Sequence, residues 1–279
     1  MHDLEELRAL AEDYLGALPF AVELGRLEEA LRYSLLGGGK RIRPVICLAT
    51  GEALGREADE LLPAACALEL VHTFSLVHDD LPALDDDDLR RGQPSAHVRF
   101  GEDVAILAGD ALLAEAFRLA LTYPVPEVAR ELAEATLGMI GGQYLDVTTD
   151  GELNGEGLRR LHALKTGRLI TASVGCATAV AQMPAGERAL WRAFGEEVGL
   201  LFQIVDDILD ATGTAAELGK TPGKDEAAGK VTYVSLYGLE RARELADDAR
   251  GRVSARLEAL QAETSVLEEL VAAVRERRA

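Results

Sequence analysis

Hydrophobic residues recur at intervals of three and four along most of the chain, and strict alternation of apolar and polar residues is scarce. The first pattern is typical of helices with one buried face, whereas alternation would indicate strands. Alanine, leucine, glutamate and arginine, all good helix formers, fill the segments between glycines and prolines. The chain is therefore predicted to be all-α. The expected helices cover residues 3–17, 21–36, 42–54, 58–80, 101–122, 126–148, 155–164, 166–182, 185–211, 230–237, 238–262 and 264–277.

The length of 279 residues suits one large domain or two small ones. No Pro/Ser-rich linker, internal repeat or low-complexity block divides the chain. The charged motifs described below extend from Lys40 to Lys230, and a boundary between them would separate parts of one site. We therefore expect a single domain over residues 1–279.

The net charge of −19 argues against a nucleic-acid partner, because nucleic-acid-binding proteins usually carry a basic surface. The N-terminus has the pattern of an amphipathic helix rather than a signal peptide, and no transmembrane segment is expected. Cys47, Cys66 and Cys176 lie far apart among apolar residues, which is typical of buried free thiols in a reducing compartment. We expect a cytoplasmic protein.

The segment from His78 to Gly92, HDDLPALDDDDLRRG, holds six aspartates within ten residues, followed by Arg90 and Arg91. Carboxylates this close repel one another unless a cation neutralises them, and hard divalent cations are the obvious candidates. The alternative is a solvated acidic loop, the usual fate of a charge run. A second acidic cluster, in FQIVDDILD, disfavours that alternative, because carboxylates within an apolar frame are costly to bury without partners.

In this second cluster Asp206 and Asp210 share one face of a helix. Two such clusters facing each other across a cavity could hold Mg²⁺ between them. Because Mg²⁺ takes one or two carboxylates and completes its shell with water and substrate phosphate oxygens, a phosphorylated ligand is implied. The nearby arginines fit this interpretation, since a guanidinium grips phosphate through two parallel hydrogen bonds.

Further motifs stand in order along the chain: GGGKRIRP from Gly37 to Pro44, LVHTFSLVHDD from Leu70 to Asp80, FGEDVAILAGDAL from Phe100 to Leu112, and HALKTGRLI from His162 to Ile170. Together with the two acidic motifs, they resemble the all-trans isoprenyl diphosphate synthases, the farnesyl and geranylgeranyl diphosphate synthase group. The resemblance covers almost the whole chain. It implies a helical bundle around a deep central cavity, three Mg²⁺ ions per active site with substrate bound, and a homodimer.

The resemblance also implies roles for individual residues. The metal ligands would be Asp79, Asp80, Asp85, Asp206, Asp207 and Asp210. Isopentenyl diphosphate would be bound by Lys40, Arg43, His72 and Arg91. The allylic diphosphate would be bound by Arg90, Lys165, Thr166, Lys220 and Lys230, with Gln203 as a further contact one helical turn before Asp206. The catalytic set would comprise Asp79, Asp80, Asp85, Asp206, Lys165 and Lys220. For His72 the alternative is a core histidine, and for Lys40, Arg43 and Lys165 it is an ordinary basic linker or turn.

Asp79 and Asp85 are six residues apart, which in an unbroken helix would place them on different faces. Pro82 suggests that the helix ends there, and a local turn could return Asp85 to the same metal. The glycine-rich segment after Gly213, with Lys220, Lys224 and Lys230, resembles a lid.

The implied reaction is the condensation of isopentenyl diphosphate with an allylic diphosphate by ionisation, condensation and elimination. Phe74 and Ser75, five and four residues before Asp79, would set product length. An aromatic residue five positions before the motif, with four residues between Asp80 and Asp85, resembles the bacterial farnesyl diphosphate synthases, so the resemblance implies farnesyl diphosphate (C15) as product, with geranylgeranyl diphosphate (C20) as the alternative. A terpene cyclase is disfavoured because it needs no isopentenyl diphosphate site, and a non-catalytic subunit because both acidic motifs are intact.

Overall fold

The computed structural model describes residues 1–149, 153–213 and 230–275. Lys220 and Lys224, in the segment that resembles a lid, lie outside these ranges. In chain order the elements are α1 (Leu4–Ala17), η1 (Val22–Leu24), α2 (Leu27–Leu36), α3 (Ile42–Ala53), α4 (Ala58–Asp79), β1 (Leu89–Arg90), β2 (Gln93–Pro94), α5 (Ala96–Phe100), α6 (Glu102–Ala120), α7 (Glu127–Thr148), α8 (Gly155–His162), η2 (Ala163–Gly167), α9 (Arg168–Val180), α10 (Ala185–Thr212), α13 (Tyr233–Tyr237), α14 (Leu239–Glu258) and α15 (Ser265–Arg275). The predicted all-α class is confirmed.

Helix α4 is the central element of the bundle. It contacts α1, α2, α3, α6, α7 and α9, and its buried positions are distributed all around the helix. A helix that is apolar on every side has to be enclosed by others. By length and composition α4 could also cross a membrane, but 72% of its most apolar window is buried inside the protein. Its hydrophobicity is therefore explained by its place in the core.

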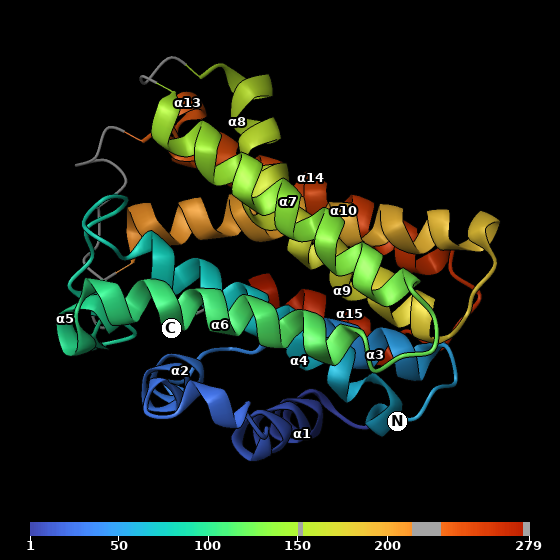
Figure 1. Ribbon diagram of the computed structural model, residues 1–279. Coiled ribbons are helices and arrows are strands. Elements are labelled where there is room, and N and C mark those ends of the chain that lie inside the picture. The colour runs from blue at the N-terminus through green and yellow to red at the C-terminus, as the bar shows by residue number, and fades with distance from the viewer. Residues whose placement is uncertain (150–152, 214–229, 276–279) are drawn as a thin grey trace.

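The helices form layers around α4 (Figure 1). Helices α1 and α2 cover one side of the layer that contains α4 and α6, while α7, α10 and α14 lie on the other side. The buried apolar side chains form one continuous cluster that extends from Leu7 on α1 to Val274 on α15. This arrangement places the carboxyl end of α4 opposite α7, η2 and the last turns of α10.

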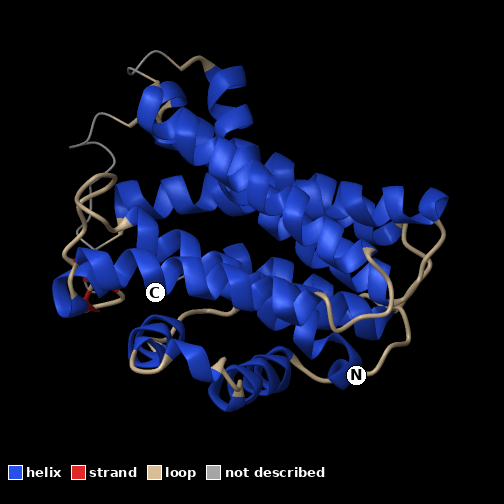
Figure 2. Ribbon diagram, viewed as in Figure 1, coloured by secondary structure: helices blue, strands red, loops and turns tan. Residues whose placement is uncertain are grey.

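The structure corrects the expected helices at three places. The segment 21–36 is divided into η1 and α2. A short helix, α5, precedes α6, although the sequence predicted no helix between residues 80 and 101. Gly101 separates α5 from α6 because its φ of 97° lies outside the helical region. A short antiparallel hairpin, β1 and β2, was also not predicted (Figure 2). Its turn places Arg91 and Gly92 at positive φ, as a two-residue hairpin connection requires.

Candidate active site

The first acidic motif folds back onto the end of α4. The backbone N–H of Asp85 donates to the carbonyl of Asp79 (2.9 Å), and that of Asp87 donates to the carbonyl of Asp80 (3.1 Å). The four residues between Asp80 and Asp85 therefore form a compact turn that returns Asp85 to Asp79. Burial raises the pKa of Asp79 to about 6, and the nearby carboxylates of Asp85 and Asp80 add to this shift, against the opposing effects of Lys165 and Arg90.

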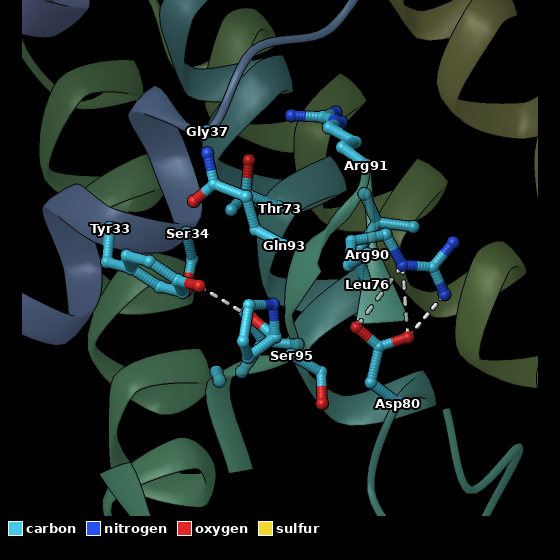
Figure 3. A pocket seen from close by; sticks show the side chains of 13 residues that line it. Tyr33, Ser34, Gly37, Thr73, Leu76, Asp80, Arg90, Arg91, Gln93 and Ser95 are labelled. Carbon is cyan, nitrogen blue, oxygen red and sulfur yellow. Dashed lines mark hydrogen bonds and ion pairs between the residues drawn. The ribbon is translucent and has the colours of Figure 1, made fainter. Parts of the chain in front are cut away.

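Asp80 is engaged by Arg90 (Figure 3). The Nε of Arg90 donates to both carboxylate oxygens of Asp80, at 3.0 and 3.2 Å, and a terminal nitrogen of the same guanidinium also contacts Asp80. Asp80 is buried, so this two-point pair is its main source of neutralisation. The hairpin holds Arg90 in place, because Arg90 is part of β1.

The residues expected to bind isopentenyl diphosphate gather around His72, which lies seven residues before Asp79 on the same face of α4. Burial lowers the pKa of His72 well below its ordinary value, and the charges of Arg43, Arg91, Arg90 and Arg41 lower it further. His72 is therefore a neutral side chain among arginines. Arg43 is buried at the start of α3, and Lys40 is exposed in the loop before it. A terminal nitrogen of Arg91 donates to the carbonyl of Gly38, so the hairpin and the GGGKRIRP loop are joined directly.

Beside the end of α4, two lysines and two carboxylates form a chain of ion pairs in which the two charges alternate. Lys165 Nζ lies 2.6 Å from Asp146 Oδ2, and Lys230 Nζ lies 3.2 Å from both Asp146 Oδ2 and Asp85 Oδ1. Burial opposes the charge on Lys230, but Asp146 and Asp85 raise its pKa overall. Burial would likewise raise the pKa of Asp146, yet Lys165 and Lys230 lower it. Asp85, Asp146 and the two lysines therefore form one charged network that reaches Asp79.

Lys165 and Thr166 lie in η2, a single turn of π-helix between α8 and α9. Two glycines on neighbouring helices let the backbone of this turn approach them closely. A Cβ on Gly142 of α7 would lie 2.3 Å from the backbone nitrogen of Lys165, and one on Gly199 of α10 would lie 3.0 Å from the Cα of Gly167. The first contact is closer than a Cβ could make without displacing the backbone, and the second would be tight. π-Turns occur frequently at functional sites, and this one presents Lys165 to Asp146.

The second acidic motif lies on the last turns of α10. Asp207 and Asp210 are buried, whereas Asp206 is exposed. Asp207 Oδ2 accepts a hydrogen bond from the backbone nitrogen of Tyr233 (2.7 Å), which ties the start of α13 to α10. Gln203, one turn earlier, is also buried. Asp206 and Asp210, which were expected to share one face of the helix, therefore differ in burial: the Asp206 carboxylate is exposed and the Asp210 carboxylate is buried.

Sequence reasoning missed Asp146 and Gln143, both on α7 in the segment GGQYLD. Asp146 is bound by two lysines, and both polar atoms of the Gln143 side-chain amide are buried without a hydrogen-bond partner among the described residues. Buried amide atoms are normally paired, so Gln143 has capacity for a ligand or water. The available signal was the spacing: Gln143 directly follows the glycine pair Gly141 and Gly142, and Asp146 stands three residues later, on the same face of the helix.

The site fits Mg²⁺ by its donor chemistry. It offers carboxylate oxygens, the ligands that this cation prefers, and one of them belongs to Asp79, whose pKa is raised chiefly by burial. Within residues 1–149, 153–213 and 230–275, no three acidic, histidine or cysteine side chains converge into a metal site by themselves. Carboxylates that leave some coordination positions open suit Mg²⁺, which completes its coordination shell with water and phosphate oxygens.

The residues expected to set product length pack between α4 and α6. The Phe74 ring meets the His78 ring edge to face, with centroids 4.9 Å apart. His78 Nε2 lies 3.0 Å from the carbonyl oxygen of Ile106, and a Cβ on Gly109 would collide with the His78 ring. Ser75 donates its hydroxyl to the carbonyl of His72 (2.8 Å). Phe74 and His78 thus form an aromatic pair just before the acidic motif, with His78 adjacent to Asp79 and Phe74 about one turn earlier.

Comparison with known proteins assigns the family. The polyprenyl synthetase family model matches residues 25–274. The chain belongs to the polyprenyl synthetase family. It is 48% identical over 247 residues to the heterodimeric geranylgeranyl pyrophosphate synthase large subunit 1, chloroplastic, of Arabidopsis thaliana, covering 83% of this chain and 66% of that protein. It is 44% identical over 257 residues to a chloroplastic geranylfarnesyl diphosphate synthase of Leucosceptrum canum, covering 88% of this chain and 70% of that protein.

Among solved structures, a geranylgeranyl pyrophosphate synthase matches with a TM-score of 0.93 and 26% identity over 100% of both chains. The predicted isoprenyl diphosphate synthase resemblance is therefore confirmed, as is the bundle architecture that it implies. The chain spans just under two thirds of the length of the first Arabidopsis relative.

The expected cytoplasmic location is wrong. Four relatives that are 45–48% identical to this chain are named as chloroplastic enzymes. The expectation rested on buried free thiols, and all three cysteines are indeed buried and free. Such thiols indicate only a reducing surrounding, and they do not distinguish one reducing compartment from another.

Proposed function

We propose that this member of the polyprenyl synthetase family is a trans-prenyltransferase that condenses isopentenyl diphosphate with allylic diphosphates, and that its main product is geranylgeranyl diphosphate (C20). The observation that carries the proposal is the charged network of Asp79, Asp85, Asp146, Lys165 and Lys230 at the end of α4, with an arginine cluster around His72 beside it. One diphosphate can be bound at the charged network and the other at the arginine cluster, so that two substrates lie side by side.

Each group of the network has a role in the reaction. The allylic C–O bond breaks and its electron pair leaves with the diphosphate, so the site has to stabilise negative charge on that group. Lys165 and Lys230 supply ammonium groups there, and Arg90 supplies a guanidinium. Mg²⁺, when bound through Asp79, Asp85 and the α10 aspartates, adds further positive charge at the same diphosphate oxygens. The proposed ligands remain the aspartates Asp79, Asp80, Asp85, Asp206, Asp207 and Asp210, with Asp80 positioned by its pair with Arg90.

The second substrate then attacks. The double bond of isopentenyl diphosphate forms the new C–C bond to the allylic cation, and loss of one proton to the departed diphosphate leaves a product longer by one isoprene unit. Lys40, Arg43, His72 and Arg91 hold the diphosphate of isopentenyl diphosphate during this step. The neutral state of His72 lets one ring nitrogen donate a hydrogen bond without adding charge to a cluster that is already cationic.

The C20 product replaces the C15 product that the position of Phe74 favoured. Relatives at 44–48% identity are named geranylgeranyl or geranylfarnesyl diphosphate synthases. The Phe74 ring meets the His78 ring edge to face, and His78 in turn lies against the carbonyl oxygen of Ile106 on α6. We propose that Phe74 packed in this way leaves room for a C20 chain.

The test is a product assay with Mg²⁺, isopentenyl diphosphate and dimethylallyl, geranyl or farnesyl diphosphate as starter. We expect all three starters to be extended, with C20 as the longest main product. Products that end at C15 would keep the activity and reject the C20 assignment, and absence of condensation with every starter would reject the synthase.

An exposed apolar face on α6 and α7 supports assembly as a homodimer. Leu137 (70% exposed), Tyr144 (65%) and Leu107 (56%) lie on this face, with Ile106, Ile140 and Val147 beside them. Figure 1 shows both helices on the same side of the bundle. A monomer rarely exposes so many large apolar side chains together. The proposed occupant is a second copy of the chain, since two Arabidopsis relatives are named subunits of heterodimers, assemblies in which a related chain pairs with another subunit.

Sedimentation of the purified chain tests this assembly. We expect a dimer that the double substitution Leu137→Glu and Ile140→Glu converts to monomers, whereas Val22→Glu, at a still more exposed apolar residue on η1, leaves the dimer intact. A wild-type monomer at micromolar concentration would reject the homodimer and favour a different partner subunit.

A further inference from the structure

A buried ion pair joins the GGGKRIRP loop to the central helix. Arg41 Nη1 lies 2.8 Å from Glu69 Oε1, and both side chains are only 2% exposed. The same guanidinium donates through Nη2 to the carbonyl of Leu35 at the end of α2 (2.7 Å). Glu12 of α1 lies 3.7 Å away. One side chain thus connects the loop to three helices.

The backbone at Arg41 is unusual. Its φ of 48° and ψ of 34° lie in the left-handed region, where a side chain with a Cβ is disfavoured. The surrounding structure has to hold such a conformation in place. Arg41 lies between Lys40 and Arg43, so its conformation decides the direction in which the loop delivers both residues to α3.

The partner of Arg41 stands one helical turn before His72. Glu69 and His72 are three residues apart on α4, and they therefore share a face. Glu69 also acts on the hairpin. Burial and the charges of Arg41 and Arg90 lower the pKa of Arg91, while Glu69 is the main group that opposes this. Glu69 is thus a carboxylate counter-charge within a group of arginines.

The hairpin also packs closely against the GGGKRIRP loop. Arg91, itself at a φ of 54°, donates to the carbonyl of Gly38. A Cβ on Gly39 would lie 2.7 Å from the guanidinium carbon of Arg91, so the loop passes directly against that side chain. The hairpin therefore meets the loop at Gly38 and Gly39, and the loop meets α4 through Arg41 and Glu69.

We propose that Arg41 and Glu69 form a positioning pair, which sets the geometry of Lys40, Arg43, His72 and Arg91 for the diphosphate of the non-allylic substrate. This inference rests on the proposed function. In this proposal neither Arg41 nor Glu69 contacts substrate. A buried ion pair is a weak source of stability compared with apolar residues of similar volume, so its presence here is explained by the geometry that it imposes on the four residues.

The test replaces both charges at once, because removal of one would leave the other buried and unpaired. The double variant Arg41→Met with Glu69→Leu keeps the volume of the pair. We expect it to fold with a Tm close to that of the wild type. Its KM for isopentenyl diphosphate, and its Kd for that compound measured by calorimetry without allylic substrate, should rise about 10- to 100-fold, the range found when supporting groups around a ligand site are removed. Its KM for the allylic diphosphate should stay within about twofold.

Two further variants complete the experiment. Arg41→Lys keeps the charge but not the planar fork, and we expect an intermediate KM. The matched control, Arg252→Met with Glu197→Leu, removes an interhelical ion pair of 2.9 Å between α14 and α10, and it should change neither KM. An unchanged KM and Kd for isopentenyl diphosphate in the Arg41 and Glu69 double variant would overturn the proposal, as would equal rises in both KM values with a large loss of Tm. A wild-type protein that neither binds nor condenses isopentenyl diphosphate would reject the proposed function, and the role of the pair with it.

Discussion

Lys165 and Asp146 form an ion pair of 2.6 Å across the gap between η2 and α7. The pair connects a lysine that the sequence motif marks to a carboxylate that it does not. Its contacts with Lys230, and through Lys230 with Asp85, make it the link between the two sides of the proposed active site.

The glycine pair on α7 provides the sharpest test of this geometry. Gly142→Ala should lower kcat by about 100-fold or more, because its Cβ would lie 2.3 Å from the Lys165 backbone nitrogen and displace η2. Gly141→Ala is the matched control. A Cβ at Gly141 meets nothing within 4 Å, so this variant should keep wild-type kcat and gain slightly in helix stability. Equal activity of the two variants would contradict the assigned role of η2.

Asp146→Asn should lower kcat by about 100-fold, the loss typical when one group of a preorganised charged site is removed. The substitution keeps the shape but removes the charge that holds Lys165 and Lys230. Circular dichroism and Tm should show that the fold is retained. Glu134→Gln, at an exposed carboxylate on the same helix, serves as the control and should leave kcat unchanged. Steady-state kinetics with both substrates saturating decides between these outcomes.

The pH dependence of stability should report Asp79. Its pKa in the fold, about 6, lies above the ordinary 3.8, so the folded state binds more protons than the unfolded state between these values. The contribution of Asp79 to stability is therefore present below pH 4 and is lost as the pH rises to about 6. The difference between the two pKa values corresponds to about 3 kcal/mol.

The measurement compares metal-free wild type with Asp79→Asn by chemical denaturation from pH 4 to 7. The variant should gain stability relative to the wild type as the pH rises through this window, and addition of Mg²⁺ should stabilise the wild type more at pH 7 than at pH 5. A pH-independent difference between the two proteins would show that Asp79 titrates normally.

Phe74→Ala should lengthen the product by at least one isoprene unit. Loss of the ring removes the edge contact with His78 and opens space between α4 and α6, at a stability cost of about 3–5 kcal/mol. Chromatography of the prenyl chains measures the result. Phe100→Ala, which removes a ring that packs on Tyr33 of α2, should leave chain length unchanged. An identical product distribution for wild type and Phe74→Ala would remove Phe74 from the wall of the cavity.

The sequence by itself determined the all-helical class, most helix positions and the residue types of the site, because helical periodicity and clusters of like charge are local patterns. DDLPALD predicted a chain reversal, and the turn from Asp79 to Asp85 is found there. The hairpin that carries Arg90 was missed, since two strands of two residues are too short to show alternation.

Only the tertiary structure decided which groups meet. The pairing of Asp146 with Lys165 and Lys230 and of Arg41 with Glu69 depends on packing between separate helices and loops, and no local pattern encodes it. The pairing of Asp80 with Arg90 depends on the hairpin that returns Arg90 to the end of α4. The same holds for Gly141 and Gly142, which look equivalent in the sequence. They differ because Gly142 alone faces η2, where the close approach of two backbones leaves no room for a Cβ.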